Sequence, residues 1–235
     1  MRTTVRSQDS EMKLDYRIVY SRRKTLEVSV ERDASVVVRA PEGTPEAQIR
    51  RAVEAKKLWL FEKTNHEQKY PPMPRRKEFV SGETILYLGR HYQLEVRDAD
   101  IDGVQFRSRF FISRKNQPHA STLFRNWYME QAIDRIPARA RYFGAAMGVR
   151  FKEVFVSNLR MRWGSCTPRA NLNFNWRIVR APANVIDYLI VHELTHLIEP
   201  NHTPRFWNIV SIQVPCADWA RQWLREHGHL LEVDF

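Results

Sequence analysis

Apolar and polar residues alternate along three short stretches near the start of the chain. The stretches YRIVYSRR, TLEVSVER and SVVVRAP lie within residues 16–41 and are separated by turn-like breaks. A period of two residues is typical of strands that bury one face and expose the other. The pattern therefore predicts a β-meander with one buried face.

Residues 43–68 change to a helical pattern. Thr44 is expected to cap this helix and Pro45 to occupy its first position, because both residue types are favoured there. The apolar residues that approximate one face are Ile49, Val53, Leu58 and Phe61. The prolines of YPPMPRRK, residues 70–77, cannot continue a helix and predict a connector. The next stretch, residues 83–96, predicts two strands joined around Gly89.

The second half of the chain is richer in helical patterns. Residues 121–148 predict a helix that Pro137 should kink or divide. FKEVFVSN (151–158) and ANLNFNW (170–176) predict two strands, which could pair as an antiparallel hairpin. Residues 183–199 are apolar nearly all round and predict a buried helix, whose polar groups need partners. We therefore expect an α+β fold, with a β-rich region carrying one long helix at residues 1–118 and a mainly helical domain at residues 119–235.

The buried helix carries HELTHLIEPNH, from His192 to His202. Positions four apart on a helix differ by about 40° in direction and about 6 Å along the axis, so His192 and His196 project to one side and can share a metal ion. Glu193 cannot easily join them as a ligand, but it can act as a general base toward a water molecule at the metal. This spacing therefore predicts a metal-dependent hydrolase.

Two residues compete as the third ligand. Pro200 should stop the helix by Glu199, and Thr203 followed by Pro204 should cap a new one, which places His202 in the turn between two helices. Glu199 would share the face of His192 if the helix persisted, but the helix axis would carry it about 10 Å away. We favour His202. The alternative for the whole cluster is two hydrogen-bonded core histidines and an exposed one.

Composition narrows the setting of this site. Hydrophobic residues make up 43% of 235, which is typical of a folded globular protein. No apolar run approaches the roughly 18 residues of a membrane span, and the first residues lack the apolar core of a signal peptide. Cys166 and Cys216 show no disulfide or zinc-ribbon spacing. We expect a cytoplasmic protein with no membrane segment.

The net charge of +11 is unevenly distributed. Lysine and arginine outnumber acidic residues by 29 to 19 in residues 1–150 and by 9 to 8 in residues 151–235. The basic excess thus lies outside the histidine cluster. Since no known nucleic-acid-reading motif accompanies it, we do not expect specific nucleic-acid binding.

The chain resembles the YgjP-like metal-dependent hydrolases, which are relatives of the zincin-type metallopeptidases. The likeness is strongest from Val156 to Gly228, in the stretches RWGSC, NWRIVRAP, DYLIVHELTHL, NHTPRFW and WARQWLREHG. This resemblance implies one zinc ion held by His192, His196 and His202, with Glu193 as catalytic base. It also implies a zincin-like α+β domain with a small antiparallel sheet, preceded by a β-rich region.

Further side chains could act on a substrate. Tyr188 lies four positions before His192 and could donate to an oxyanion, although a packed core tyrosine is the commoner case. Arg162 and Arg205 could stabilise negative charge. Cys166 is expected to be a small packed residue rather than a nucleophile.

Three functions remain open on these grounds. We favour a zinc metallopeptidase, which should bind an extended peptide along an edge strand such as FKEVFVSN. The same metal site could serve a nucleotide phosphoanhydride hydrolase (a pyrophosphatase), which would need several basic residues around it. A structural metal in a nucleic-acid-binding module would need a fourth protein ligand, such as Glu199 or Cys166. The oligomeric state is not indicated.

Overall fold

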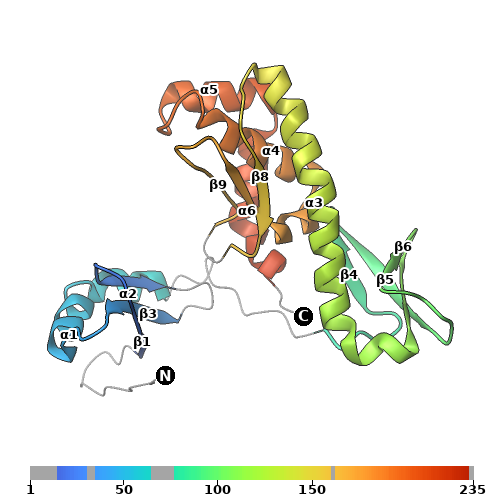
Figure 1. The fold of residues 1–235 in the computed structure, drawn as a ribbon, viewed down its shortest axis with the longest axis horizontal. Coiled ribbons are helices and arrows are strands. Elements are labelled where there is room, and N and C mark those ends of the chain that lie inside the picture. Colours follow the sequence, from blue (N-terminus) through green and yellow to red (C-terminus); the bar gives the residue numbers. More distant parts are fainter. Residues whose placement is uncertain (1–14, 31–34, 65–76, 160–161, 233–235) are drawn as a thin grey trace. The chain divides into compact units, whose positions relative to one another are not determined.

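The computed structural model describes residues 15–30, 35–64, 77–159 and 162–232 (Figure 1). These residues belong to two compact units, Met1–Met73 and Pro74–Phe235. Each unit has a hydrophobic core of its own. The predicted connector at residues 70–77 contains this division and lies, apart from Lys77, outside the described residues.

The first unit contains a three-stranded sheet. Its strands are β1 (Tyr16–Ser21), β2 (Glu27–Val30) and β3 (Val36–Pro41), in the order β1-β3-β2. The three predicted strands are confirmed, but the predicted meander is wrong. The reason is that β1 runs parallel to β3 instead of pairing with β2, and the apolar residues of the VVVRAP stretch place β3 at the centre.

Two short helices, α1 (Glu46–Glu54) and α2 (Lys57–Thr64), replace the predicted long helix. Helix α1 starts after Pro45 without a side-chain cap, so the capping role expected of Thr44 is wrong. The Thr44 hydroxyl instead donates to the carbonyl of Pro41, 2.8 Å away, at the end of β3.

The buried face of these helices also differs from the expected one. Ile49, Val53 and Leu60 are buried against the sheet, whereas Leu58 is 74% exposed and Phe61 is 45% exposed. The break between α1 and α2 means that a face counted along one continuous helix does not carry over from α1 into α2. Within α2, Leu60 takes the buried position and Leu58 and Phe61 are exposed.

The second unit begins with a four-stranded sheet in the order β4-β5-β7-β6. Its strands are β4 (Thr84–Tyr87), β5 (Arg90–Arg97), β6 (Gln105–Phe106) and β7 (Phe110–Ser113). The predicted pairing of β4 with β5 around Gly89 is confirmed. One face of the sheet joins an aromatic cluster, in which Tyr87 and Phe110 meet Trp127 edge-on at 4.8 and 5.0 Å.

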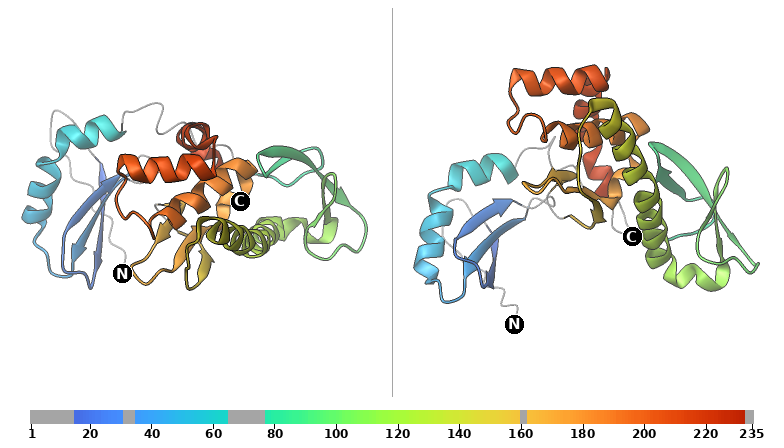
Figure 2. Two further views of the ribbon diagram at one scale, coloured as in Figure 1. Left: turned by 90° about the horizontal axis from the view of Figure 1, so that it is seen from above. Right: turned by 45° about the horizontal axis from the view of Figure 1, so that its top comes forward.

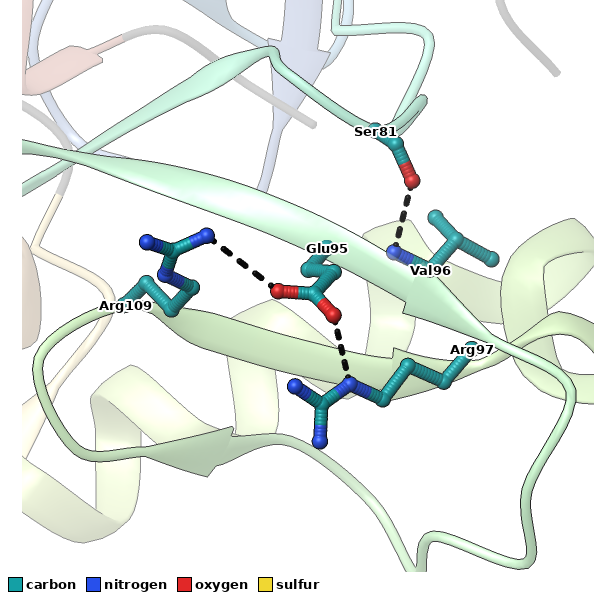
Figure 3. Close-up of polar contacts among 5 residues, drawn as sticks. All are labelled: Ser81, Glu95, Val96, Arg97 and Arg109. Atoms are coloured by element: carbon teal, nitrogen blue, oxygen red, sulfur yellow. Dashed lines mark hydrogen bonds and ion pairs between the residues drawn. The ribbon is translucent and has the colours of Figure 1, made fainter.

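The other face of this sheet carries charged side chains. Because side chains alternate along a strand, Glu95 points away from the buried Leu94 and Val96. Figure 3 shows the Glu95 carboxylate between Arg97 and Arg109, which donate to it at 2.6 and 3.3 Å. The N–H of Val96 donates to the hydroxyl of Ser81. The sheet therefore contributes only one face to the core.

The tip of the β4–β5 hairpin contacts the segment that precedes the buried helix starting at Ala183. The N–H of Leu88 donates to the carbonyl of Val179 at 3.0 Å, and the N–H of Gly89 donates to that of Arg180 at 2.9 Å. Gly89 has a φ of 75°, and a Cβ there would lie 2.6 Å from Cγ of Pro182. Only glycine fits this contact without strain.

Helix α3 (Ala120–Met147) is the longest element of the second unit. It extends from the four-stranded sheet at one end to a second, smaller sheet at the other (Figures 1 and 2). Pro137 does not divide it, because the helix is continuous from Ala120 to Met147. The helix ends at Gly148, which adopts a left-handed conformation.

The smaller sheet contains β8 (Val154–Ser157), β9 (Gly164–Cys166) and β10 (Leu172–Asn175), in the order β8-β10-β9. The expected antiparallel pairing of FKEVFVSN with ANLNFNW is wrong, because β8 and β10 are parallel. The antiparallel partner of β10 is β9, from the WGSC stretch. The sheet is consequently mixed and not purely antiparallel.

Three helices complete the unit, namely α4 (Ala183–Thr195), α5 (Pro204–Gln213) and α6 (Ala217–His227). Helix α4 packs against α3, α5, α6 and β9. Arg139 of α3 forms a two-pronged ion pair with Asp187 of α4, with N–O distances of 2.8 and 2.6 Å. These contacts place α4 at the centre of the unit.

The expected α+β class, with small sheets and a long helix, is confirmed. The boundary expected between residues 118 and 119 falls inside the second compact unit, just before α3. The assignment of separate roles to residues 1–118 and 119–235 stays a prediction. In the described residues, no helix is both long and apolar enough to cross a membrane.

Candidate metal centre

Helix α4 is buried on nearly all sides, as its apolar sequence predicts. Eight of its residues illustrate this, namely Val185, Ile186, Tyr188, Leu189, Ile190, Val191, Glu193 and Leu194. The polar residue Thr195 is also fully buried, and its hydroxyl donates to the carbonyl of Val191 at 2.7 Å. The hydroxyl of Thr195 is therefore satisfied within the helix itself.

Three histidines converge at the end of this helix. His192 lies in the last turn of α4, His196 is the first residue after it, and His202 lies in the turn that precedes α5. One ring nitrogen from each histidine lies within 4.8 Å of the others. The Nε2 atoms of His192 and His202 are 3.1 Å apart.

The spacing of the His192 and His202 nitrogens fits two ligands of a tetrahedral zinc ion. Two nitrogens that each lie about 2.0–2.1 Å from zinc at a tetrahedral angle are about 3.3 Å from each other. Nδ1 of His196 lies 3.1 Å from the carbonyl oxygen of Pro200, to which a ring nitrogen can only donate. The lone pair of His196 is then on Nε2, and the hydrogen bond fixes the orientation of the ring.

The electrostatics also fit a metal ligand. Burial, followed by the nearby His196, His202 and Arg221, lowers the pKa of His192 to about 3. Burial likewise lowers the pKa of His196. Neutral imidazole is the form that binds metals. Nδ1 of His192 is buried with no hydrogen-bond partner among the described residues.

The other candidate ligands lie outside this group. Across the described part of the chain, the three histidines are the one set of His, Cys, Asp or Glu side chains with this spacing. Helix α4 ends at Thr195, so Glu199 is in the following turn and has left the helical face of His192. Cys166 is also absent from the group.

Glu193 is enclosed between α4 and β9. It is only 5% exposed, and burial raises its pKa to about 7, while the N–H of Cys166 and the charge of Arg162 act in the opposite direction. The N–H of Cys166 hydrogen-bonds to the carboxylate. A Cβ on Gly164 would lie 2.8 Å from Oε1 of Glu193. The strand thus packs its backbone directly on this carboxylate.

A pocket of about 670 Å³ opens beside Glu193 and two of the histidines. The residues that line it are Gly164, Ser165, Cys166, Thr167, Pro168, His192, Glu193, His196, Leu197 and Pro200. The buried carboxylate of Glu193 therefore faces the same space as His192 and His196. Neither lysine nor arginine is part of this described lining.

Comparison with known protein families decides the relationship. Residues 24–227 match the family described as "YgjP-like, metallopeptidase domain", which is most of the chain. The chain belongs to the YgjP-like family. A search of curated proteins finds no match. Among solved structures, the metallopeptidase zymogen abylysin of Pyrococcus abyssi is similar, with 18% identity and a TM-score of 0.34 over 37% of this chain and 86% of that one.

In this YgjP-like protein, two of the three residues predicted to contact a substrate lie near the candidate metal centre. Tyr188 is buried, and the centre of its ring lies 5.8 Å from the centre of the His192 ring. Burial raises the pKa of the Tyr188 phenol. Arg162 is exposed, and its charge acts on Glu193. Arg205 is exposed in the first turn of α5, and no contact among the described residues brings it to the histidines.

Cys166 and Asp187 both lie outside the histidine group. Cys166 is partly buried, and burial together with Glu193 raises the pKa of its thiol. A thiol of that kind is a poor nucleophile at neutral pH. Asp187 does not orient a histidine and instead joins two helices through Arg139.

The sequence did not indicate one basic residue that lies near the candidate metal centre of this YgjP-like protein. Arg221 of α6 lies over the ring of Trp207, 4.9 Å from its centre, and its charge acts on both His192 and Tyr188. No spacing in the sequence relates Arg221 to the histidine motif. The relationship arises only because α5 and α6 pack together.

Proposed function

We propose that this YgjP-like protein is a zinc-dependent peptide hydrolase in which Glu193 is the general base. The observation that carries the proposal is the shared pocket, in which a buried carboxylate lies beside His192 and His196. A structural zinc site has no need of an adjacent buried carboxylate, whereas a hydrolytic site does.

In this proposal His192, His196 and His202 hold one zinc ion. Three neutral imidazoles are the ligand set of several catalytic zinc sites, which leave the fourth position open. When bound, zinc supplies a Lewis acid and an acidified water molecule at neutral pH. The identity of the metal rests on ligand type, since imidazole also suits other late first-row metals.

Glu193 accepts a proton at its carboxylate in this mechanism. The carboxylate oxygens lie between the pocket and β9, where the N–H of Cys166 holds one orientation and Gly164 leaves the necessary space. A side chain fixed in this way is preorganised for proton transfer, because little reorganisation is needed when the substrate arrives. Tyr188 and Arg162 are the candidates for stabilising negative charge on the substrate.

The edge strand that serves the substrate is β9 in this proposal, and not the FKEVFVSN strand expected from the sequence. Both β8 and β9 are edges of the small sheet, but β8 packs against α3 and β9 lies against α4 and lines the pocket. The N–H of Thr167 donates to the carbonyl of Asn171, just before β10, so by alternation Gly164 and Cys166 direct their backbone groups away from β10. The N–H of Cys166 already bonds Glu193, which leaves the backbone groups of Gly164 and the carbonyl of Cys166 for a substrate. An extended peptide could add along this edge.

The character of the pocket favours an amide over a polyphosphate. Its described lining contains no lysine or arginine, and Glu193 adds negative charge. Hydrolases of nucleotide phosphoanhydrides surround the phosphates with cationic groups. We therefore place peptides ahead of nucleotides as the substrate class.

The test combines metal content with activity. Elemental analysis should find one zinc per chain in the wild type and in Glu193→Gln. In a mixed panel of peptides and nucleoside triphosphates, only the wild type should cleave a peptide, with Glu193→Gln slower by about 10²–10⁴-fold. Glu199→Gln is the matched control, since Glu199 lies six residues away and outside the histidine group.

Three results would change the proposal. Equal activity of Glu193→Gln and wild type would remove Glu193 from the mechanism. Cleavage of triphosphates alone would reassign the substrate class. A wild type and a His196→Ala variant with the same zinc content would remove the metal assignment, and His91→Ala controls for the loss of an exposed histidine elsewhere.

A further inference from the structure

His202 differs from the other two histidines in how it is supported. His192 belongs to a buried helix, and His196 follows directly at its end. His202 is exposed in the short turn between α4 and α5, where the N–H of Thr203 donates back to the carbonyl of Asn201. Its position therefore depends on contacts beyond its own turn.

The orientation of the His202 ring is also not set by a hydrogen bond. Histidines that bind metals are usually oriented by a bond from the second ring nitrogen, as His196 is by Pro200. For His202, the one hydrogen-bond contact of the ring among the described residues is with Nε2 of His192. Packing must consequently provide the orientation.

Trp207 and Phe206 provide this packing. Its ring stacks on that of His202 with a centroid distance of 5.5 Å and an interplanar angle of 23°. Phe206 meets the same imidazole nearly edge-on at 4.7 Å. Phe206 is fully buried, whereas Trp207 is only partly buried and needs a further contact to hold its indole.

Arg221 supplies that contact from another helix. Its guanidinium lies over the Trp207 ring at 4.9 Å, within the range of a cation–π interaction. A planar guanidinium on a tryptophan face is a favourable pairing that restricts the rotation of the indole. The contacts thus run from α6 through Trp207 to His202.

We propose that Arg221 is a positioning residue for the metal centre, acting through Trp207 on the His202 imidazole. This inference rests on the proposed function, because it assumes that His202 binds the metal. Arg221 holds the indole against His202, and the stacked indole keeps the imidazole turned toward His192. Without Arg221 the indole of Trp207 is held less firmly, and the His202 imidazole is then freer to rotate. A metal ion must therefore order this imidazole when it binds.

The first measurement is metal affinity, which does not depend on any substrate. Zinc dissociation constants would be determined by competition with a chromophoric chelator. Arg221→Ala should bind zinc about 3- to 30-fold more weakly than the wild type, and Arg221→Lys should recover part of the loss because it retains a cation over the ring. Arg225→Ala, one turn further along α6 and also exposed, should bind as the wild type does.

The second measurement reports ligand geometry directly. The visible absorption of the cobalt(II)-substituted protein depends on the number and arrangement of its ligands, so Arg221→Ala should alter its intensity while Arg225→Ala should not. Trp207→Leu should reproduce the effect of Arg221→Ala on both measurements. Adding Arg221→Ala to Trp207→Leu should weaken zinc binding by less than about twofold, because the two residues act in series.

The outcomes separate this inference from the proposed function. If the wild type binds neither zinc nor cobalt, the metal site itself is wrong. If the wild type binds zinc and Arg221→Ala binds it equally well with an unchanged cobalt spectrum, only the role of Arg221 is overturned. A full effect of Arg221→Ala in the Trp207→Leu background would also overturn it, since Arg221 would then act without Trp207.

Discussion

Gly164 and Glu193 pack so closely that no side chain fits between them. A Cβ on Gly164 would lie 2.8 Å from Oε1, 2.9 Å from Cγ and 3.1 Å from Cδ of Glu193. Three atoms of one buried side chain would have to move together. The glycine of the WGSC stretch is therefore required by the position of the carboxylate and not by a turn.

Gly164→Ala is expected to displace Glu193 while leaving the histidines in place. Peptide hydrolysis should fall by about 10²–10⁴-fold, as for the removal of a general base, with zinc content unchanged. Activity assays and elemental analysis of Gly164→Ala beside Glu193→Gln would check this. Wild-type activity in Gly164→Ala would show that the carboxylate tolerates displacement or takes no part.

Removal of the metal should destabilise the protein. A ligand that binds only the folded state at about 100 times its dissociation constant adds about 2.7 kcal/mol to the free energy of unfolding. A chelator should then lower Tm by roughly 5–10 °C for a unit of this size. Calorimetry of the wild type and His196→Ala, with and without chelator, is the measurement. The variant should show no shift, and an unshifted wild type would contradict a tightly held metal.

Asp187→Asn is expected to affect stability and not metal binding. The Arg139–Asp187 pair joins α3 to α4, but the Arg139 side chain is 42% exposed, so solvent screening limits its contribution to about 0.5–1 kcal/mol. Urea unfolding should show this loss, while the zinc dissociation constant stays within about threefold. Asp134→Asn on the exposed side of α3 is the control. A large loss of zinc affinity in Asp187→Asn alone would mean that the pair orients the histidines.

Tyr128 should make the protein sensitive to alkali. Burial raises the pKa of its phenol to about 12, against an ordinary value near 10, and the hydroxyl donates to the carbonyl of Leu86 at 2.5 Å. Between these values the unfolded state loses a proton that the folded state keeps. The stabilisation is therefore complete below pH 10 and is lost as the pH rises toward 12.

The corresponding variant is Tyr128→Phe, which has no proton to lose. Between pH 9 and pH 11 the wild type should lose about 1 kcal/mol more of its free energy of unfolding than the variant does. Denaturant unfolding at both pH values gives the comparison. Tyr142→Phe, at a side chain that is 60% exposed, should follow the wild type. Parallel curves for wild type and Tyr128→Phe would show that the buried phenol ionises as freely as in water.

Local sequence signals predicted the core of the site because they depend on neighbouring residues. The four-residue spacing of His192 and His196 belongs to the geometry of one helix. Thr203 and Pro204 mark the start of α5 in the structure as in the sequence, with the Thr203 hydroxyl accepting from the N–H of Phe206. These two signals were enough to place His202 between the helices.

Features set by long-range packing were not predictable in this way. Nothing local distinguishes parallel from antiparallel pairing of β8 with β10, since either buries the same apolar residues. The pocket lies beside β9 and not beside the FKEVFVSN strand, and no local pattern in the sequence indicates this. Arg221 is separated from His192 by most of two helices, and its proximity depends on how α5 and α6 pack.

The hairpin tip at Leu88 and Gly89 connects the β-rich start of the second unit to the segment that leads into α4. Both amides donate to carbonyls in the segment just before α4, and these bonds form only when that segment is in place. Their hydrogen exchange therefore reports the opening of this junction. Because a bound metal favours every contact of the folded state, zinc should slow deuterium uptake at these two amides, even though neither residue belongs to the metal centre.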